Sequence, residues 1–405
     1  MTAQMLPGTN ISIRPRVPWW ETVDAKIVSQ LELERLGECD SFDVAVIGAG
    51  ISGLSAAQAA ASQGARVIVL EKAPLIGLGA SGQNAGIVCV GANMPLSAVK
   101  PGSQAGELWA ATAALAEEVF AEAAREGALL RARRTGSLFL AKSPTAARRM
   151  AVEVKLRRNA NLRAELMGPQ EAKNLSHGLL NVEGVHAAQF LPDEGRAHPL
   201  SLLATLARRA RDAGAKLFGG AEVVKRDEVA AKNGRSTWCL TLTGGQQVHA
   251  RAIIRCTGPV VEANARIFAL AFKNELPDEL PVFQDAAPFT YYDYRPGDGF
   301  ISVSGGKYGR AGGGASDERY WHNMAKAARE WLPQLASHQP DYCWAVDLNV
   351  TADMIPEIKR LSTSAPAVAI EGLGALGVLP GMALGRRAGA EMVSSLADSA
   401  HRSKK

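Results

Sequence analysis

The sequence contains few cysteines, and none of them has a neighbour at a spacing that predicts a bond. The five cysteines are an odd number, include no Cys-x-x-Cys pair and lack the spacing of zinc or iron–sulfur ligands. A disulfide framework and a metal centre are therefore not expected. The sequence also has no apolar run of the ~18 residues typical of a membrane span, and residues 1–16 lack the apolar core of a secretory signal. We expect a cytoplasmic protein in a reducing compartment, without a membrane span.

Charge of one sign is not in large excess either. Lys and Arg outnumber Asp and Glu by 45 to 40, which gives a formal net charge of +5. The short basic clusters over 131–134 and 208–211 are more typical of solvated helix faces than of a nucleic-acid surface. No nucleic-acid partner is therefore expected. The length of 405 residues exceeds what a single core usually supports, so two domains are expected.

The first positive signal is a complete βαβ dinucleotide motif. A strand over 42–47 runs into a glycine-rich turn over 48–53, which is followed by an apolar helix and a second strand over 66–70. The glycines allow a tight turn, close approach of the main chain to a pyrophosphate, and close helix–strand packing. The pyrophosphate is expected at the positive end of the helix that begins near Ile51. Glu71 has the spacing expected for an acid that binds ribose hydroxyls.

A second glycine-rich segment, over 77–86, indicates which dinucleotide binds. Its small residues let main-chain N–H groups reach a large flat anion, and Ser81 and Asn84 offer short polar contacts. An NAD enzyme has no need for such a loop. Here the chain resembles the D-amino-acid oxidase superfamily of FAD-dependent amine and amino-acid oxidoreductases. It is most similar to the glycine oxidase, D-amino-acid dehydrogenase and γ-glutamylputrescine oxidoreductase branches, in which this loop lies along the flavin ring.

The resemblance extends to three later segments. Residues 221–224 match a strand whose valine main chain pairs with the adenine edge, and residues 256–258 match a small-residue turn beside the FAD phosphates. Residues 371–378 match the loop that brings the N-terminus of the last helix toward the flavin pyrimidine, where a helix dipole stabilises negative charge. Many relatives carry a histidine where Leu376 stands.

The resemblance therefore implies a set of FAD-binding residues. They are Gly48, Gly50, Ile51, Ser52, Gly53, Glu71, Lys72, Gly79, Ala80, Ser81, Gln83, Asn84, Ala85, Gly86, Val223, Val224, Thr257, Gly258, Gly374, Leu376, Gly377 and Val378. Some relatives attach FAD covalently through cysteine or histidine. This chain has Val346 at the position of the sarcosine oxidase cysteine and no histidine in 77–91, so non-covalent FAD is expected.

The substrate residues are expected on a long hairpin, which resembles the substrate-domain hairpin of the amine oxidases. Its arms lie over 288–295 and 299–306 and are joined by a Pro-Gly-Asp-Gly turn. Strand alternation divides the first arm into two faces. One face carries Tyr291, Asp293 and Arg295, and the other carries Tyr292 and Tyr294.

Four side chains of this region are candidates for positioning substrate. Arg295 or Lys307 would bind a carboxylate, with arginine able to do so through two hydrogen bonds. Tyr291 or Tyr292 would orient the bound molecule. The alternative for the tyrosines is ordinary cross-strand packing, and the alternative for Arg295 is a solvated position beside a turn.

The expected fold is α/β. A Rossmann-like FAD-binding domain would be interleaved with an α+β substrate domain built on an antiparallel sheet. We expect an N-terminal docking segment over 1–40, an FAD-binding domain over 41–100, 185–258 and 343–400, and a substrate domain over 101–184 and 259–342.

The expected reaction is oxidation of a C–N bond in a small-molecule amine or amino acid. A hydride passes to the flavin N5, the imine is hydrolysed, and oxygen or an electron carrier reoxidises the flavin. Three alternatives remain open. The chain could be the flavin subunit of a heteromeric dehydrogenase with an electron-transfer partner, an enzyme that oxidises a modified RNA base, or a non-catalytic FAD-binding scaffold.

Overall fold

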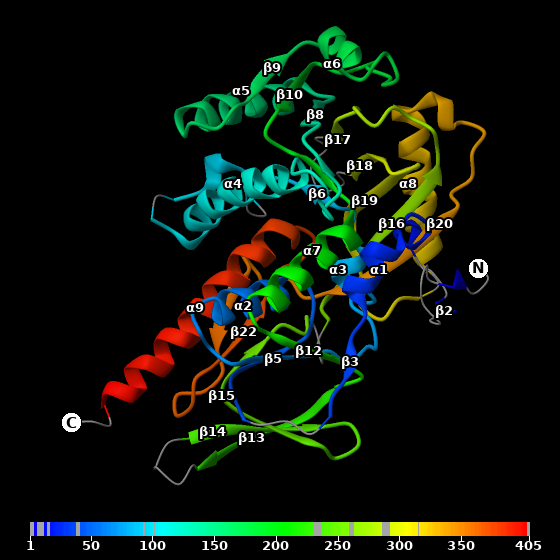
Figure 1. Ribbon diagram of the computed structural model, residues 1–405. Helices are drawn as coiled ribbons and strands as arrows, with labels where there is room; N and C mark the ends of the chain where they lie inside the picture. The colour runs from blue at the N-terminus through cyan, green and yellow to red at the C-terminus, as the bar shows by residue number, and fades with distance from the viewer. Residues whose placement is uncertain are drawn as a thin grey trace.

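The computed structural model describes residues 4–5, 12–13, 17–37, 41–91, 94–100, 102–230, 236–258, 263–285, 292–314 and 316–402, with side chains from residue 17 to residue 397. Figure 1 shows a mainly parallel sheet with long helices in the lower half of the view. An antiparallel sheet with further helices lies at the top and right. The expected α/β fold, with a Rossmann-like, mainly parallel sheet beside an antiparallel sheet, is confirmed.

The lower sheet has a parallel centre because its strands are apolar on both faces. The FDVAVI sequence of its central strand is almost wholly buried, as is usual for a parallel strand covered by helices on both sides. Within the described residues the sheet has nine strands. They are β3 (Glu34–Arg35), β4 (Phe42–Ile47), β5 (Val67–Leu70), β12 (Lys216–Gly219), β13 (Val223–Ala230), β14 (Ser236–Leu242), β15 (Gln247–Arg255), β21 (Glu357–Arg360) and β22 (Ala367–Glu371).

Two helices of this half pack unusually close together. Helix α9 (Val378–Arg402) lies against α2 (Ile51–Ala61) through Gly381, Gly385 and Gly389, which repeat every four residues and so share one face. A Cβ atom on Gly385 would lie 2.3 Å from the Ser52 carbonyl oxygen, so only glycine permits this approach.

The antiparallel sheet forms the second half. Its order within the described residues is β20-β16-β19-β18-β17-β8-β10-β9. The strands are β8 (Ser137–Ala141), β9 (Glu165–Met167), β10 (Ala187–Leu191), β16 (Ala265–Lys273), β17 (Val282–Asp285), β18 (Tyr292–Gly297), β19 (Phe300–Gly309) and β20 (Tyr342–Leu348). Short strands complete the described chain: β1 (Gln4–Met5) pairs with β2 (Ser12–Ile13), and β11 (Gly195–Ala197) pairs with β6 (Ile87–Val88) and β7 (Ala132–Arg133).

The two faces of the antiparallel sheet have different neighbours. One face packs in a cluster with Met324, Ala328 and Trp331 of α8 (Asp317–Trp331). The opposite face includes Ala269, Phe300 and Trp344, which belong to the same core cluster as the helices of the parallel half. We call the first the α8 face and the second, which faces the parallel half, the inner face. The two faces are therefore distinct environments.

The remaining helices cover the surface or connect the halves. They are η1 (Pro18–Glu21), α1 (Ala25–Leu31), α3 (Ala80–Gln83), η2 (Leu96–Ala98), α4 (Gln104–Ala123), α5 (Pro144–Asn159), α6 (Pro169–Leu175), α7 (Pro199–Asp212) and η3 (Pro333–Leu335). Ser103 and Ser143 cap α4 and α5 by accepting a main-chain N–H with their hydroxyls. Within the described part of the chain, no helix has the length and apolar character needed to cross a membrane.

Strand pairing suggests a refinement of the domain boundaries. Strands β10 and β20 pair in the antiparallel sheet, although the boundaries expected from sequence put 187–191 and most of 342–348 in the FAD-binding domain. Because strands of one sheet share a core, we propose that both belong to the substrate domain. The N-terminal segment is held against the body by Trp19 and Trp20, which are both buried.

Candidate cofactor and substrate site

Two positions of the 48–53 turn, Gly48 and Gly53, have space only for glycine. A Cβ atom on Gly53 would lie 1.9 Å from the Gly48 carbonyl oxygen, and one on Gly48 would lie 2.8 Å from the Cys256 carbonyl oxygen. Gly48 also has a φ of 101°, in the region that favours glycine. Gly50 caps α2 without a side-chain hydrogen bond, so the positive end of α2 is free to face an anion. The end of this helix contains the predicted Ile51, Ser52 and Gly53.

Glu71 lies beside this turn, at the carboxyl end of β5. Its carboxylate accepts hydrogen bonds from the main-chain N–H groups of Ala49, at 2.8 Å, and Ala73, at 3.1 Å. The N–H of Ala221 donates to the Glu71 carbonyl oxygen at 2.9 Å. These contacts bring the predicted ribose-binding acid next to the start of β13, while its neighbour Lys72 is exposed.

The two valines predicted at the adenine edge begin β13. The ladder between β13 and β14 shifts register between Val223 and Lys225, so Val224 lies at a bulge. The Val224 side chain is 61% exposed, whereas Val223 packs on the core beneath the sheet. The structure thus puts both valines near Glu71, with the bulged one open to a ligand.

Hydrogen bonds between polar groups of the 77–86 loop fix its conformation. The Gln83 amide donates to the Leu78 carbonyl oxygen at 2.8 Å, and the Asn84 side chain accepts from the Gly86 N–H at 2.7 Å. The Ser81 hydroxyl accepts from the Ile51 N–H at 3.1 Å and so ties the loop to the end of α2. These side chains, predicted as cofactor contacts, have structural partners of their own. The predicted Gly79, Ala80 and Ala85 lie in the same loop, between the two halves of the molecule.

Two tryptophans hold the loop from outside. The Trp19 indole donates to the Asn84 carbonyl oxygen, and the Trp344 indole donates to the Gln83 carbonyl oxygen, both at 3.0 Å. Trp19 comes from the N-terminal segment and Trp344 from the inner face of the antiparallel sheet. The loop therefore lies where three parts of the chain meet.

The other predicted segments reach the same edge of the parallel sheet. Thr257 and Gly258 follow β15 directly and are exposed. Gly374, Leu376 and Gly377 lead into α9 at Val378, and a Cβ on Gly381 in its first turn would lie 3.0 Å from the Ser52 hydroxyl. The N-terminal ends of α2 and α9 are therefore neighbours, and their positive dipole ends lie close together.

This arrangement fits an extended dinucleotide with a flavin at one end. A helix end lies at the pyrophosphate position, an acid lies beside the bulged strand, and a second helix end lies beside the long glycine loop. The family model for FAD-dependent oxidoreductases of the DAO type matches residues 43–391. The chain belongs to this family. It is an FAD-dependent oxidoreductase, as the sequence predicts.

Solved structures agree with this fold. L-proline dehydrogenase from P. horikoshii superposes with a TM-score of 0.73 at 18% identity, covering 88% of this chain and 95% of that chain. Glycine oxidase from Geobacillus kaustophilus gives a TM-score of 0.70 at 19% identity, with coverage of 88% and 95%. Iminodiacetate oxidase from Chelativorans sp. BNC1 gives 0.68 at 22% identity, with coverage of 87% and 95%. No curated protein matches the sequence.

The predicted substrate residues of this DAO-family flavoprotein do not come together. Tyr291 lies outside the described residues. Tyr292 and Lys307 line a cavity of about 370 Å³ with Arg319, Tyr320 and Asn323 of α8. That cavity is on the α8 face, on the side of the sheet away from the 77–86 loop. The predicted hairpin is present as β18 and β19, but alternation alone does not say which of its faces meets the cofactor.

Arg295 is on the inner face, but both terminal nitrogens of its guanidinium are already engaged, and its Nε is buried without a partner among the described residues. It is completely buried and donates to the carbonyl oxygens of Gly297, at 2.9 Å, and Ala197, at 3.2 Å. It pairs with Asp298 at 2.5 Å and stacks on the Trp19 ring at 4.8 Å from the centroid. Burial lowers the pKa of Arg295 to about 10, and Asp298 opposes that shift. The structure thus supports a structural role and not the predicted carboxylate-binding role.

The inner face also contains polar side chains to which the sequence pattern assigned no specific role. Asp293 is buried and accepts a hydrogen bond from the Gln284 amide. Tyr308 follows on β19, within hydrogen-bonding reach of the Ala375 main chain in the flavin-side loop. Alternation had placed Asp293 on the Arg295 face. Its pairing with Gln284 could not be predicted, because the residues between β17 and β18 carry no turn signal that sets the register.

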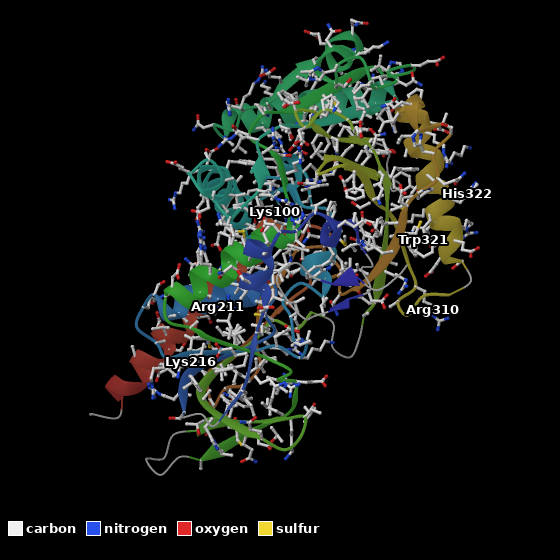
Figure 2. The ribbon with its side chains drawn as sticks, turned by 45° about the vertical axis from the view of Figure 1, so that its right-hand side comes forward. Lys100, Arg211, Lys216, Arg310, Trp321 and His322 are labelled. Carbon is white, nitrogen blue, oxygen red and sulfur yellow. The ribbon has the colours of Figure 1, made fainter. Side chains whose placement is uncertain are left out.

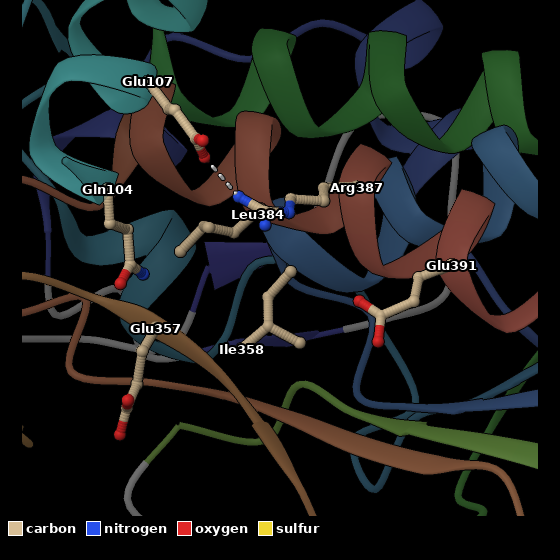
Figure 3. Close-up of a pocket in the computed structure, with 7 residues that line it drawn as sticks. All are labelled: Gln104, Glu107, Glu357, Ile358, Leu384, Arg387 and Glu391. Atoms are coloured by element: carbon tan, nitrogen blue, oxygen red, sulfur yellow. Dashed lines mark hydrogen bonds and ion pairs between the residues drawn. The ribbon is translucent and has the colours of Figure 1, made fainter. Parts of the chain in front are cut away.

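A second hollow lies elsewhere and is not the cofactor site. Figure 3 shows a cavity of about 390 Å³ between α4, α9 and β21, crossed by the ion pair between Glu107 and Arg387 at 2.8 Å. Both paired side chains are largely exposed, so the pair adds little stability. None of the predicted FAD-binding residues lines this cavity.

Proposed function

We propose that this flavoprotein oxidises a carbon–nitrogen bond of a small amine or amino acid. The observation that carries the proposal is the position of the inner face, between the 77–86 loop and the loop that leads into α9. A substrate on that face would contact the flavin and a small set of polar side chains together. The names of the solved relatives, a proline dehydrogenase, a glycine oxidase and an iminodiacetate oxidase, refer to substrates with such a bond.

The chain's own residues support this chemistry in three ways. Phe300 and Trp344 are buried on the inner face and exclude water from it. Asp293 and Tyr308 offer polar contacts that orient a bound amine. The N-terminal end of α9 would stabilise negative charge on the adjoining part of the cofactor. When bound, FAD supplies the two-electron acceptor for the hydride, and the product imine is hydrolysed by water.

An anaerobic substrate screen tests the proposal. Amines, D- and L-amino acids and N-methyl amino acids are mixed with the purified holoprotein while the flavin absorbance is followed. We expect at least one of these classes to bleach the flavin, and oxygen or an artificial electron carrier to restore it. A flavin that none of them reduces, although dithionite does, would contradict the proposal.

We further expect FAD to be held without a covalent bond. Cys89 follows the 77–86 loop, and Cys256 lies beside the 48–53 turn. Burial raises the pKa of both thiols, that of Cys256 to about 12. Such thiols remain protonated and are weak nucleophiles. Precipitation with trichloroacetic acid should leave the yellow colour in the supernatant. A yellow pellet would show a covalent bond, and Cys89→Ser and Cys256→Ser variants would then locate it.

A further inference from the structure

The inner face of the antiparallel sheet contains a row of residues in cross-strand register. Gln284, Asp293 and Ser304 are directly paired on β17, β18 and β19. The row continues through Ala269 to Trp344, which donates to the 77–86 loop. Asp293 therefore lies at the centre of the face, in line with the flavin loop.

The surroundings of Asp293 place it near the two loops expected to contact the flavin. Its charge contributes to raising the pKa of the Cys89 thiol, a few residues beyond the 77–86 loop, and that of the Tyr308 hydroxyl. Burial is the larger cause for both groups. Charges in a buried site are only weakly screened, so these interactions place the three side chains in one region of the molecule. Since Tyr308 also reaches the Ala375 main chain, that region adjoins both loops.

Asp293 is a buried acid without a cation beside it. It takes part in none of the ion pairs among the described residues. Its hydrogen-bond donor is the neutral amide of Gln284, and the titratable groups near it are Glu194, Cys89 and Tyr308, with Asp285 acting through the sheet from the α8 face. Arg157 is engaged by Glu153 and Glu194. A buried carboxylate without a positive partner is costly, so a ligand is the natural source of the missing charge.

The cations near the inner face are already engaged or point elsewhere. Arg295 is paired with Asp298, and Lys273 at the sheet edge is paired with Glu21 at 3.0 Å. Lys307 is on the α8 face, and Arg310 is exposed at the end of β19, at the outer side of the view in Figure 2. Neither Lys nor Arg occurs in the sequence of residues 259–262, which precede β16, or of residues 286–291, which precede β18. No described cation is therefore free to bind a carboxylate at this site.

We propose that Asp293 binds the cationic nitrogen of the substrate, and that the substrate is a primary or secondary amine without a carboxylate on the carbon that is oxidised. The inference rests on the proposed C–N oxidation and narrows it. A carboxylate in the same place would face the like charge of Asp293, with no arginine or lysine to compensate it. Ser304 and Tyr308 would provide neutral hydroxyl contacts.

The pairing also explains how a neutral amine forms. An amine in neutral water arrives as an ammonium ion. The ammonium N–H donates to a carboxylate oxygen of Asp293, and one proton then passes to that oxygen, which leaves a neutral amine and a neutral carboxyl. No electron moves in this step. Burial raises the pKa of Asp293 to about 7, with Asp285 and Glu194 adding to the shift and the Gln284 hydrogen bond opposing it. That pKa suits a proton acceptor at neutral pH.

Matched substrate pairs provide the first test. Each pair consists of an amine and the amino acid that differs from it by one α-carboxylate, such as phenethylamine with L- and D-phenylalanine, and putrescine with L- and D-ornithine. We expect the amines to bleach the flavin and the amino acids to fail. Bleaching by the amino acids alone would overturn this inference and leave the proposed C–N oxidation intact. Bleaching by no compound would count against the proposed function itself.

An Asp293→Asn variant provides the second test. We expect kcat/KM for the best amine to fall roughly 30-fold or more, the lower range for removing one member of a buried charge pair, mostly through KM. Asp285→Asn is the matched control, because Asp285 is on the neighbouring strand but faces α8, where it contacts Tyr294 and Trp331. The control should keep its KM, and both variants should retain FAD. Equal KM values for the wild type and Asp293→Asn would overturn the proposal.

The pH profile of the wild type is a third readout that needs no variant. Below its pKa Asp293 is neutral and cannot pair with an ammonium ion. We therefore expect kcat/KM to fall as the pH drops through about 7, with an acid limb that is absent in Asp293→Asn. A wild-type kcat/KM that stays constant from about pH 5 to about pH 8, a range that spans this pKa, would refute the role of Asp293.

Discussion

Replacing Gly53 with alanine is expected to produce a folded protein that is largely free of FAD. The added Cβ would lie 1.9 Å from the Gly48 carbonyl oxygen and 3.3 Å from a Val46 methyl group. Both neighbours belong to the central strand or its turn, so the end of α2 must move away from β4. Overpacking of this kind costs about 1–3 kcal/mol. If that strain falls on the bound state, FAD affinity drops roughly 10- to 100-fold.

The measurement is the ratio of flavin to protein absorbance after purification, followed by titration with added FAD. Gly314→Ala is the control, because a Cβ there meets nothing within 4 Å. The control should retain its colour. A Gly53→Ala protein that purifies with a full complement of tightly bound FAD would contradict the packing that places the pyrophosphate at α2.

Replacing Arg295 with methionine is expected to destabilise the protein strongly without abolishing its chemistry. The change removes the hydrogen bonds to Gly297 and Ala197 and leaves the Asp298 carboxylate without its closest cation. Breaking a buried ion pair usually costs about 3–5 kcal/mol. Asp298 keeps Arg196 at 3.5 Å and Arg131 at 3.7 Å. We therefore expect a loss of about 3 kcal/mol in the free energy of unfolding, at the low end of that range.

The pH dependence of this loss follows from Asp298. Burial would raise its pKa, but Arg295, His198 and Arg196 outweigh burial and lower the pKa to about 2. A lowered carboxyl pKa stabilises the fold above the unfolded value near 3.8 and loses that contribution as the pH falls toward 2. The difference between wild type and Arg295→Met should therefore be full at pH 7 and shrink under strong acid.

A double variant distinguishes the loss of the Arg295–Asp298 ion pair from the loss of a substrate contact. In Arg295→Met/Asp298→Asn the uncompensated carboxylate is gone, so urea unfolding should show partial recovery of stability. KM for the best substrate should be the same in both variants as in the wild type. A large rise in KM with unchanged stability would instead favour the carboxylate-binding role that the hairpin sequence suggested.

The cofactor half was predictable because its signals are local. The strand, turn, helix and second strand all lie within residues 42–70, and the structure places β4 at 42–47, the start of α2 at Ile51 and β5 at 67–70, almost as expected. Gly48 and Gly53 each meet a main-chain carbonyl oxygen that leaves no space for a side chain, which is why the spacing is so informative. The last helix begins at Val378, at the end of the 371–378 loop that the resemblance indicated.

The substrate half was harder to predict because its decisive contacts are distant in sequence. Arg295 is engaged by Ala197 and Trp19, from two other parts of the chain, so nothing near the hairpin indicates that its guanidinium is occupied. Alternation correctly put Asp293 and Arg295 on one face and Tyr292 on the other. Which face meets the cofactor depends on where α8 packs, and that packing is not encoded in the hairpin itself.

The glycine-mediated contact between α2 and α9 has a consequence for the order of biosynthesis. The pyrophosphate turn is synthesised well before α9, the helix that locks it in place. A nascent chain therefore has only part of its dinucleotide cradle until α9 has left the ribosome. Stable binding of the vitamin-derived cofactor should accordingly wait for α9, and a chain truncated before Gly381 should purify without colour.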